Sequence, residues 1–349
     1  MEQKRMRRYG ILILPAANKV YTGASVELTR AELAVFGDRL FPGRLTGIDT
    51  RRLGGVDYVT FDADELSEED LNRLANLSSR YALFELRDDL LLPLDAHPED
   101  RFDDDLLTIP KYVGKTNELF TKLLLNVTLL SSDLAAEWGR RKLRVLDPLA
   151  GRGTTLSQAL TYGFDALGVE ADGKHVDAYA AFLRTWLKRK RVKHHAEITR
   201  IRRDKKQIGR RLHAEIGVDR ESYKAGERLT LDLVHADTLR AAEFFPDRSV
   251  DLIVTDAPYG VQHGSRDRTD GLTRSPLELL NAAVPGWCRL LRAGGAVGIS
   301  WNTYGAGRDE IAAILSDNGL RVCDTPAHHG FRHRVDQAIT RDLIVATKA

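Results

Sequence analysis

Apolar and polar positions along the first hundred residues follow two different periods. Short apolar runs predict strands, segments with apolar residues three and four positions apart predict helices, and Ser67 is a typical N-cap for the second helix. The strands are expected at 9–14, 56–61 and 81–86, and the helices at 28–36 and 68–77. Pro93, Pro98 and three consecutive acids at 103–105 then predict a linker. We therefore expect a small α+β domain over residues 1–100.

The remaining residues, 107–349, show a regular alternation of strands and helices. An amphipathic helix is expected up to residue 130, with Thr116 or Asn117 as its N-cap. Strands are expected at 143–147, 164–169, 229–234, 250–255, 296–301, 320–323 and 338–347. Such alternation is typical of a doubly wound sheet. The expected fold class is α/β, a Rossmann-like seven-stranded sheet preceded by the smaller domain.

The segment Leu143–Gly153 (LRVLDPLAGRG) is the most informative stretch of the chain. It passes from an apolar strand through Asp147 into a glycine-rich turn, and a helical segment follows. Gly151 and Gly153 allow a sharp turn that brings backbone N–H groups against a ligand. A dinucleotide fingerprint requires a third glycine where Leu156 stands, so the pattern argues against a pyrophosphate ligand.

Two further strands end in residues that can bind a ligand or take part in catalysis. Glu170 follows the strand at 164–169, where a carboxylate can accept both hydroxyls of a ribose. The strand at 250–255 ends in the sequence DAPYG, residues 256–260. Together with the glycine-rich turn, these strand ends resemble the class I S-adenosylmethionine-dependent methyltransferases that act on exocyclic amino groups. Their acceptor motif is Asp or Asn, Pro, Pro and an aromatic residue, and this chain has Ala257 in place of the first proline.

The acceptor motif suits a poor nucleophile. The lone pair of an exocyclic amino nitrogen is delocalised into the base. The Asp256 carboxylate and the Ala257 carbonyl can each accept one N–H, which turns the lone pair toward the methyl group. Pro258 stiffens the turn, and Tyr259 offers a face on which the base can stack. Because the second acceptor is a main-chain group, alanine can replace the proline. An ordinary strand-to-loop turn is the alternative interpretation of DAPYG.

The resemblance implies a binding site for S-adenosylmethionine at the ends of the first three strands. A GKTN-like segment before the helix lines this pocket in similar RNA-directed enzymes, and a polar group after the strand at 229–234 meets the adenine. The expected cofactor-binding residues are Tyr112, Lys115, Thr116, Asp147, Pro148, Ala150, Gly151, Gly153, Thr154, Thr155, Glu170, Ala171, Asp237 and Thr238. The expected catalytic residues are Asp256, Ala257, Pro258 and Tyr259.

Composition narrows the class of protein. The 349 residues are 43% hydrophobic and 29% charged, as in soluble globular proteins. No apolar run reaches membrane-spanning length, and the basic N-terminus leads into too few apolar residues for a signal peptide. The two cysteines, Cys288 and Cys323, cannot form a disulfide framework or a zinc site, and the adjacent His194 and His195 have the wrong spacing for metal ligands. We therefore expect a cytoplasmic protein without membrane association and without a metal.

The net charge of +2 hides two charged blocks. Residues 57–105 hold 16 acids and 4 bases, whereas residues 184–211 hold 13 Lys and Arg and 2 acids. The helix that begins near His175 is expected to continue into this basic block, as a solvated helix pair or as a phosphate-binding surface. The polar stretch at 261–275 is expected to be a surface loop or a mobile loop over the acceptor. The expected substrate-binding residues are Arg189, Arg191, Arg202, Arg203, His263, Arg266 and Arg268.

In its layout the chain is most similar to the tRNA guanine-N2 methyltransferases, whose members often carry an N-terminal THUMP domain that grips RNA. The resemblance implies methyl transfer from S-adenosylmethionine to an exocyclic amino nitrogen of a nucleobase, with guanine N2 in tRNA or other RNA as the target and RNA favoured over DNA. The acidic residues 1–100 are a departure from that pattern.

Three alternatives stay open. One is a DNA adenine-N6 methyltransferase, although the loop after DAPYG is short for reading duplex bases. Another is an N-methyltransferase of a small natural product that bears an amino or amidine group. The last is an RNA-binding relative that has lost catalysis.

Overall fold

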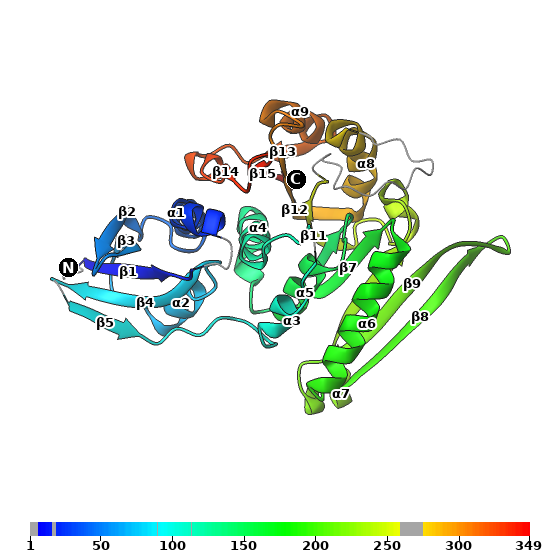
Figure 1. The fold of residues 1–349 in the computed structure, drawn as a ribbon, viewed down its shortest axis with the longest axis horizontal. Coiled ribbons are helices and arrows are strands. Elements are labelled where there is room, and N and C mark those ends of the chain that lie inside the picture. Colours follow the sequence, from blue (N-terminus) through cyan, green and yellow to red (C-terminus); the bar gives the residue numbers. More distant parts are fainter. Residues whose placement is uncertain (1–5, 16–18, 89, 113, 259–274) are drawn as a thin grey trace.

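Two β-sheets organise the chain. The computed structural model describes residues 6–15, 19–88, 90–112, 114–258 and 275–349. A five-stranded antiparallel sheet lies at one end of the molecule, and a ten-stranded mixed sheet forms the rest (Figure 1). No helix within these ranges combines the length and the apolar character that crossing a membrane requires.

The N-terminal sheet has the strand order β2-β3-β1-β4-β5. Its strands are β1 (Arg7–Ile13), β2 (Thr46–Leu53), β3 (Val56–Ala63), β4 (Arg80–Arg87) and β5 (Leu90–Leu94), and its helices are α1 (Lys19–Leu40) and α2 (Glu68–Leu74). Ser67 caps α2 in a capping box with Asp70, as expected. The sequence did not predict β2 and β5. Pro93, which was expected in a linker, lies in the edge strand β5, where a proline removes no ladder hydrogen bond toward a neighbour.

Helix α4 (Glu118–Ser131) lies between the two sheets (Figure 1). Asn117 is its N-cap and accepts the N–H of Leu119 at 2.8 Å. On the N-terminal side, the α1 residue Arg39 donates to the carbonyls of Leu130 and Ser132, each at 2.7 Å. One buried apolar cluster contains residues from both sheets and from α4. The division into domains at 1–100 and 107–349 therefore stays a prediction.

Seven strands of the large sheet carry the expected fold. They follow in the order β10-β7-β6-β11-β12-β15-β13, and β15 is antiparallel to its neighbours β12 and β13. The strands are β6 (Arg144–Asp147), β7 (Asp165–Glu170), β10 (Arg228–His235), β11 (Val250–Asp256), β12 (Leu291–Asn302), β13 (Leu320–Val322) and β15 (Thr340–Lys348). The order reverses between β6 and β11, which makes the crevice at their carboxyl ends a topological switch point.

Of the six further helices that the structure describes in this region, four begin in segments expected to be helical, whereas those at 105–108 and 220–225 were not predicted. The six helices are α3 (Asp105–Thr108), α5 (Thr154–Thr161), α6 (Gly173–Arg189), α7 (Arg220–Ala225), α8 (Pro276–Leu290) and α9 (Arg308–Asp317), with short 3-10 turns η1 (Ala135–Glu137), η2 (Thr238–Glu243) and η3 (Pro326–His329). A two-residue strand, β14 (His333–Arg334), pairs with β15.

The expectation that the helix continues into the basic block was wrong. Helix α6 ends at Arg189, and the block forms a long antiparallel hairpin of β8 (His194–Arg203) and β9 (Lys206–Gly217). Asp204 and Lys205 have φ values of 50° and 63°, which suits a two-residue hairpin turn with both central residues left-handed. In β9 the buried residues Leu212, Ala214 and Ile216 alternate with more exposed ones, the period of a strand. The hairpin and β14 bring the sheet from the expected seven strands to ten.

Candidate active site

The parallel strands β6, β7, β10 and β11 end along one edge of the large sheet, which we call the carboxyl edge. Their last residues are Asp147, Glu170, His235 and Asp256. Because parallel strands bring their carboxyl ends to the same edge, residues 109 positions apart in the chain meet in one crevice. The expected glycine turn, ribose carboxylate and acceptor motif therefore share this edge.

The glycine turn after β6 has the expected left-handed backbone. Gly151 and Gly153 have φ values of 51° and 79°. A Cβ on Gly153 would lie 2.5 Å from the ring of Tyr179, so only glycine fits there. A Cβ on Gly151 would meet nothing within 4 Å, which shows open space beside the turn. The Glu170 carboxylate accepts the Gly151 N–H at 2.7 Å and the Asp172 N–H at 2.7 Å, so it faces this space from the adjacent strand.

Asp147 lies under the crevice and is 4% exposed. Its carboxylate accepts the Leu149 N–H at 3.0 Å and the Thr255 hydroxyl at 2.8 Å. Burial away from water raises the pKa of Asp147 to about 6, against the opposing effect of hydrogen bonds from Thr155 and Thr255. The charge of Asp256 nearby raises it further.

Asp147→Asn is expected to stabilise the cofactor-free protein above pH 6. A carboxyl whose pKa is raised in the folded state makes folding less favourable as the pH rises from its unfolded pKa to its folded pKa. The gap in unfolding free energy between variant and unaltered protein should therefore grow by about 1 kcal/mol from pH 5 to pH 7.5, and reach about 3 kcal/mol. Urea unfolding at a series of pH values measures it. A gap that does not change with pH would contradict the raised pKa of Asp147. Asp247→Asn, which changes an exposed carboxylate, is the control.

Most of the other expected cofactor residues lie around this turn. The Tyr112 hydroxyl lies 3.1 Å from the Thr154 hydroxyl at the start of α5, and the Arg152 guanidinium stacks 4.8 Å above the Tyr112 ring. Pro148 and Ala150 are buried in the turn, and Thr155 is buried in α5. These contacts place the segment before α4 against the glycine turn.

The residues that follow β7 and β10 are arranged differently. Ala171 is exposed, and its carbonyl lies 3.0 Å from the His235 ring. Asp237 is exposed and caps η2 by accepting the Leu239 N–H at 2.9 Å. The Thr238 side chain is buried and accepts the indole N–H of Trp287 at 3.2 Å, so it packs into the core. Asp237 is therefore better placed than Thr238 to meet a ligand.

Within the part of the chain that the structure describes, three side chains hold the Asp256 carboxylate. The Thr116 hydroxyl donates to Oδ2 at 2.6 Å, the Ser300 hydroxyl donates to Oδ1 in a short hydrogen bond, and the Arg341 guanidinium lies 3.5 Å from Oδ2. Arg341 is 5% exposed on its side chain and stacks 4.4 Å above the Phe120 ring. The carboxylate is thereby fixed in one orientation at the switch point.

Sequence reasoning missed two of these three residues. Ser300 lies on β12 directly opposite Asp256, and a polar residue within the apolar run of that strand is the signal that was available. Arg341 lies on β15 and had no local signal. Thr116 was expected on the cofactor, but its hydroxyl contacts Asp256. Lys115 pairs with Glu118 at 3.2 Å and donates to the Leu107 carbonyl at 2.6 Å, which holds the segment before α4 to α3.

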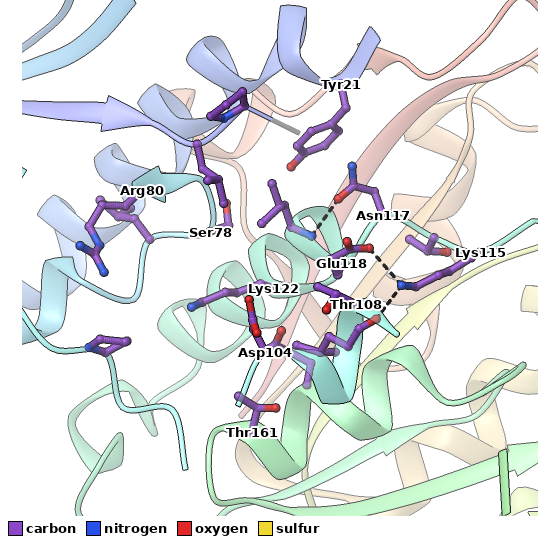
Figure 2. Close-up of a pocket in the computed structure, with 18 of the residues that line it drawn as sticks. Tyr21, Ser78, Arg80, Asp104, Thr108, Lys115, Asn117, Glu118, Lys122 and Thr161 are labelled. Carbon is purple, nitrogen blue, oxygen red and sulfur yellow. Dashed lines mark hydrogen bonds and ion pairs between the residues drawn. The ribbon is translucent and has the colours of Figure 1, made fainter. Parts of the chain in front are cut away.

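A cavity of about 510 Å³ adjoins this network between the two sheets. Thr116 and Arg341 line it on the side of Asp256, and Tyr21, Ser78 and Arg80 line it from the N-terminal side. Figure 2 shows Arg80 and Ser78 on one side of the cavity and Lys115 and Asn117 on the other. The cavity therefore joins the N-terminal sheet to the acceptor side of the site.

The rest of the acceptor motif is described only in part. The Ala257 N–H donates to the Ser300 carbonyl at 2.8 Å, which continues the β11–β12 ladder, and Pro258 is exposed. The expected residues Tyr259, His263, Arg266 and Arg268 lie outside the described residues. Among the described residues, no three His, Cys, Asp or Glu side chains gather into a group that could hold a metal ion.

The structure separates the four expected arginines of the basic block. Arg202 and Arg203 end β8 at the carboxyl edge, where Arg203 pairs with Glu243 at 3.0 Å. Arg189 ends α6 and Arg191 follows it, and both lie at the opposite edge of the sheet. Eight strand steps of β8, from His194 to Arg202, place the two pairs roughly 26 Å apart along the hairpin. The two pairs cannot contact the same stretch of an acceptor.

The residues at the carboxyl edge suit S-adenosylmethionine. Its ribose diol requires an acceptor such as Glu170, its chain requires the open space beside Gly151, and Asp237 offers a second exposed carboxylate at the next strand end. The strand order with an antiparallel β15, the glycine turn and the carboxylates at the strand ends define a class I methyltransferase.

Comparison with known families agrees with this class. Residues 134–295 match the model of the family described as "RMKL-like, methyltransferase domain". The protein is an S-adenosylmethionine-dependent methyltransferase, so the expected enzyme class, fold and cofactor are confirmed. No curated protein sequence matches the chain significantly.

Solved structures that resemble the chain include two methyltransferases and a pre-rRNA processing protein. A TehB-like SAM-dependent methyltransferase from Corynebacterium glutamicum has 14% identity and a TM-score of 0.34, covering 60% of this chain and 82% of that one. The magnesium protoporphyrin IX methyltransferase of Synechocystis has 14% identity and a TM-score of 0.37, covering 68% and 87%. The fibrillarin pre-rRNA processing protein of Methanococcus jannaschii has 12% identity and a TM-score of 0.33, covering 60% and 67%.

Proposed function

We propose that this enzyme methylates an exocyclic amino nitrogen of a nucleobase, guanine N2 in tRNA or another RNA. The observation that carries the proposal is the Asp256 carboxylate, which Thr116, Ser300 and Arg341 hold beside the glycine turn. A fixed carboxylate at this point is what an amino group needs as its hydrogen-bond acceptor. The match of residues 134–295 to an RMKL-like methyltransferase domain supports the same class of reaction.

Each part of the site has one task in the proposed reaction. S-adenosylmethionine supplies a methyl group on a positively charged sulfur. Glu170 and the turn at Gly151 bind and orient the cofactor, while Asp256 and the Ala257 carbonyl accept the two N–H groups of the acceptor. This pair of hydrogen bonds aims the nitrogen lone pair at the methyl group, so that the chain contributes alignment and charge stabilisation.

The charges around the site support RNA as the acceptor. The carboxyl edge is flanked by the hairpin β8–β9, whose residues 200–211 contain seven Lys and Arg and one acid. A polyanion is the natural partner of such a segment. An amino group must leave its stack to reach Asp256, which is easiest in single-stranded or looped RNA. The cytoplasm, where tRNA is processed, is the proposed location.

The N-terminal residues 1–100 have a place in this proposal. We propose that they form a separate small domain, THUMP-like in role, that completes the acceptor side of the site. The support is the cavity, because Tyr21, Ser78 and Arg80 line it together with the Asp256-bound residues Thr116 and Arg341. An acceptor that reaches Asp256 passes close to both units.

A direct assay tests the acceptor. Purified protein and isotope-labelled cofactor are incubated with unmodified tRNA transcripts, with adenine-containing duplex DNA and with free nucleosides, and the digested products are separated by mass spectrometry. We expect the label in tRNA, as N2-methylguanosine. RNA from a strain that lacks the gene should have lost the same nucleoside.

The other outcomes of this assay replace the proposal. Label in N6-methyladenine of the DNA alone would make the protein a DNA methyltransferase. Label in neither polymer, with transfer to small amines, would indicate a small-molecule enzyme. Cofactor binding without any transfer would indicate a relative that has lost catalysis.

A further inference from the structure

The hairpin β8–β9 extends past the carboxyl edge of the large sheet, as Figure 1 shows. Strand β9 pairs with β10 as far as Arg210, which lies opposite His235, and His235 lies opposite Glu170. Beyond that point the two hairpin strands pair only with each other, from Ile201 opposite Gly209 to the turn. Four residues at about 3.3 Å each carry the overhang about 13 Å beyond the edge. We call residues 200–210 the hairpin tip.

One face of the hairpin tip is anchored to the enzyme. Ile201 and Ile208 pack against the apolar cluster under the carboxyl edge. The Arg203 guanidinium pairs with the Glu243 carboxylate at 3.0 Å, and Arg240 donates to the Ile208 carbonyl at 3.4 Å. The tip is therefore held at a fixed place beside the site, and its other face is turned to solvent.

Four exposed cations lie on the tip, with Arg200 and Arg202 on the face away from Arg203, Lys205 in the turn and Lys206 opposite Arg203. Arg200, Arg202, Lys205 and Lys206 are exposed, and no ion pair joins any of them to a carboxylate of the described residues. Arg203 and Arg210, by contrast, are paired with Glu243 and Asp177. The four side chains therefore keep their full charge for a partner.

Edge strands often carry Lys or Arg only to prevent edge-to-edge association. Such protection would place charges along the whole of β8, which is the edge strand of the sheet. The half of β8 that lies over the sheet, residues 194–199, contains no Lys or Arg, although its side chains are largely exposed. The cations are concentrated in the overhanging half, next to the active site.

We propose that the hairpin tip binds the sugar-phosphate backbone of the RNA acceptor at a distance from the target nucleotide; this rests on the proposed function. Strands β10, β7 and β6 lie between the hairpin and β11, so four strand spacings to β9 and five to β8, about 20–24 Å, separate the tip from Asp256. The tip therefore positions the polymer and does no chemistry. The RNA phosphates that the tip binds therefore lie several nucleotides away from the reacting base.

Two matched variants test the tip. The tip variant carries Arg200→Glu, Arg202→Glu, Lys205→Glu and Lys206→Glu. The control variant carries Lys188→Glu, Lys193→Glu, Arg220→Glu and Lys224→Glu, which also reverses four exposed cations but at the opposite edge, around the end of α6 and in α7. The two variants have the same net charge, so a difference between them reports location. Melting temperature and cofactor affinity show that both are folded.

For unmodified tRNA transcripts, the KM of the tip variant should be at least about tenfold higher than that of the unaltered protein. Its kcat at saturating RNA should stay within about twofold of the unaltered protein's. The slope of log affinity against log salt should fall by about 3, since each lost phosphate contact on a single strand removes about 0.7. The control variant should retain the KM and the slope of the unaltered protein. RNA fragments too short to span about 20 Å should be methylated equally by all three proteins.

The outcomes separate this inference from the proposed function. If the unaltered enzyme methylates tRNA and the two variants have the same KM and salt slope, the hairpin tip is not a phosphate site, and the proposed function stands. If the unaltered enzyme transfers no methyl group to RNA, the proposed function fails, and the inference falls with it. A large fall in kcat of the tip variant at saturating RNA would also overturn a purely positioning role.

Discussion

Asp256→Ala is expected to lower kcat at least about a hundredfold while leaving the affinity for S-adenosylmethionine nearly unchanged. The substitution removes the carboxylate that accepts the Thr116 and Ser300 hydroxyls and that, in the proposed reaction, accepts the amino N–H. The proposed contacts to the cofactor come from Glu170 and the turn at Gly151 and not from this carboxylate. Single-turnover rates on the tRNA substrate measure the first effect, and calorimetry measures the second.

Two further variants define the cause of that loss. Asp256→Asn should be milder, because its amide oxygen still accepts a hydrogen bond. Asp247→Ala, which removes an exposed carboxylate that pairs with Arg289 just before β11, should leave kcat unchanged. Full activity of folded Asp256→Ala would overturn the assignment of the site.

The parts of the site that the sequence predicted are those with local signals. The glycine turn, Glu170 and Asp256 each follow an apolar run directly, so strand, turn and chemistry could be inferred from a few adjacent residues. Their meeting at one edge followed from the parallel sheet that the alternation of elements predicted. The N-terminal sheet was predicted less completely, because the mostly exposed strand β2 shows few apolar positions and the short apolar run of β5 contains Pro93, which was assigned to a linker.

The residues that hold Asp256 could not be predicted locally, because they come from distant elements. Thr116 lies 140 positions from Asp256 in the chain, and Arg341 lies 85 positions away. Their contacts depend on where α4 and β15 pack, which no short pattern specifies. Thr116 was assigned to the cofactor because its GKTN-like segment resembles one that lines the cofactor pocket in similar enzymes. Tyr112, just before that segment, does face the glycine turn.

The sequence did not predict the hairpin because its many charged residues obscure the alternation of buried and exposed positions that is typical of a strand. In β8 the exposed edge position leaves few buried residues to alternate with polar ones, and a run of Lys and Arg is also compatible with a helix. The turn at Asp204 and Lys205 lacks the Asn-Gly or Asp-Gly pair that marks a two-residue hairpin. Only β9, with its alternating buried residues, carried a clear strand signal.

Glu170→Ala is expected to weaken S-adenosylmethionine binding by about 1–3 kcal/mol, as for a lost charge-assisted hydrogen bond. That free energy corresponds to a Kd about 5- to 150-fold higher. The structure adds a second effect of the substitution, because the Glu170 carboxylate also accepts the Gly151 and Asp172 N–H groups. Loss of those bonds would loosen the glycine turn, so the single variant alone does not identify the ribose as the partner.

A thermodynamic cycle that changes both the residue and the ligand separates the loss of a ribose contact from the loosening of the glycine turn. S-adenosylhomocysteine and its 2′,3′-dideoxy analogue are titrated into the unaltered protein, Glu170→Ala and the control Asp177→Asn, whose residue lies on α6 and pairs with Arg210. If Glu170 holds the diol, the substitution should cost much less for the dideoxy analogue than for the full ribose, because the hydroxyls that Glu170 would bind are already gone. An equal cost for both ligands would mean that Glu170 acts only by shaping the turn at Gly151. Unchanged affinity for both in folded Glu170→Ala would remove Glu170 from the cofactor site.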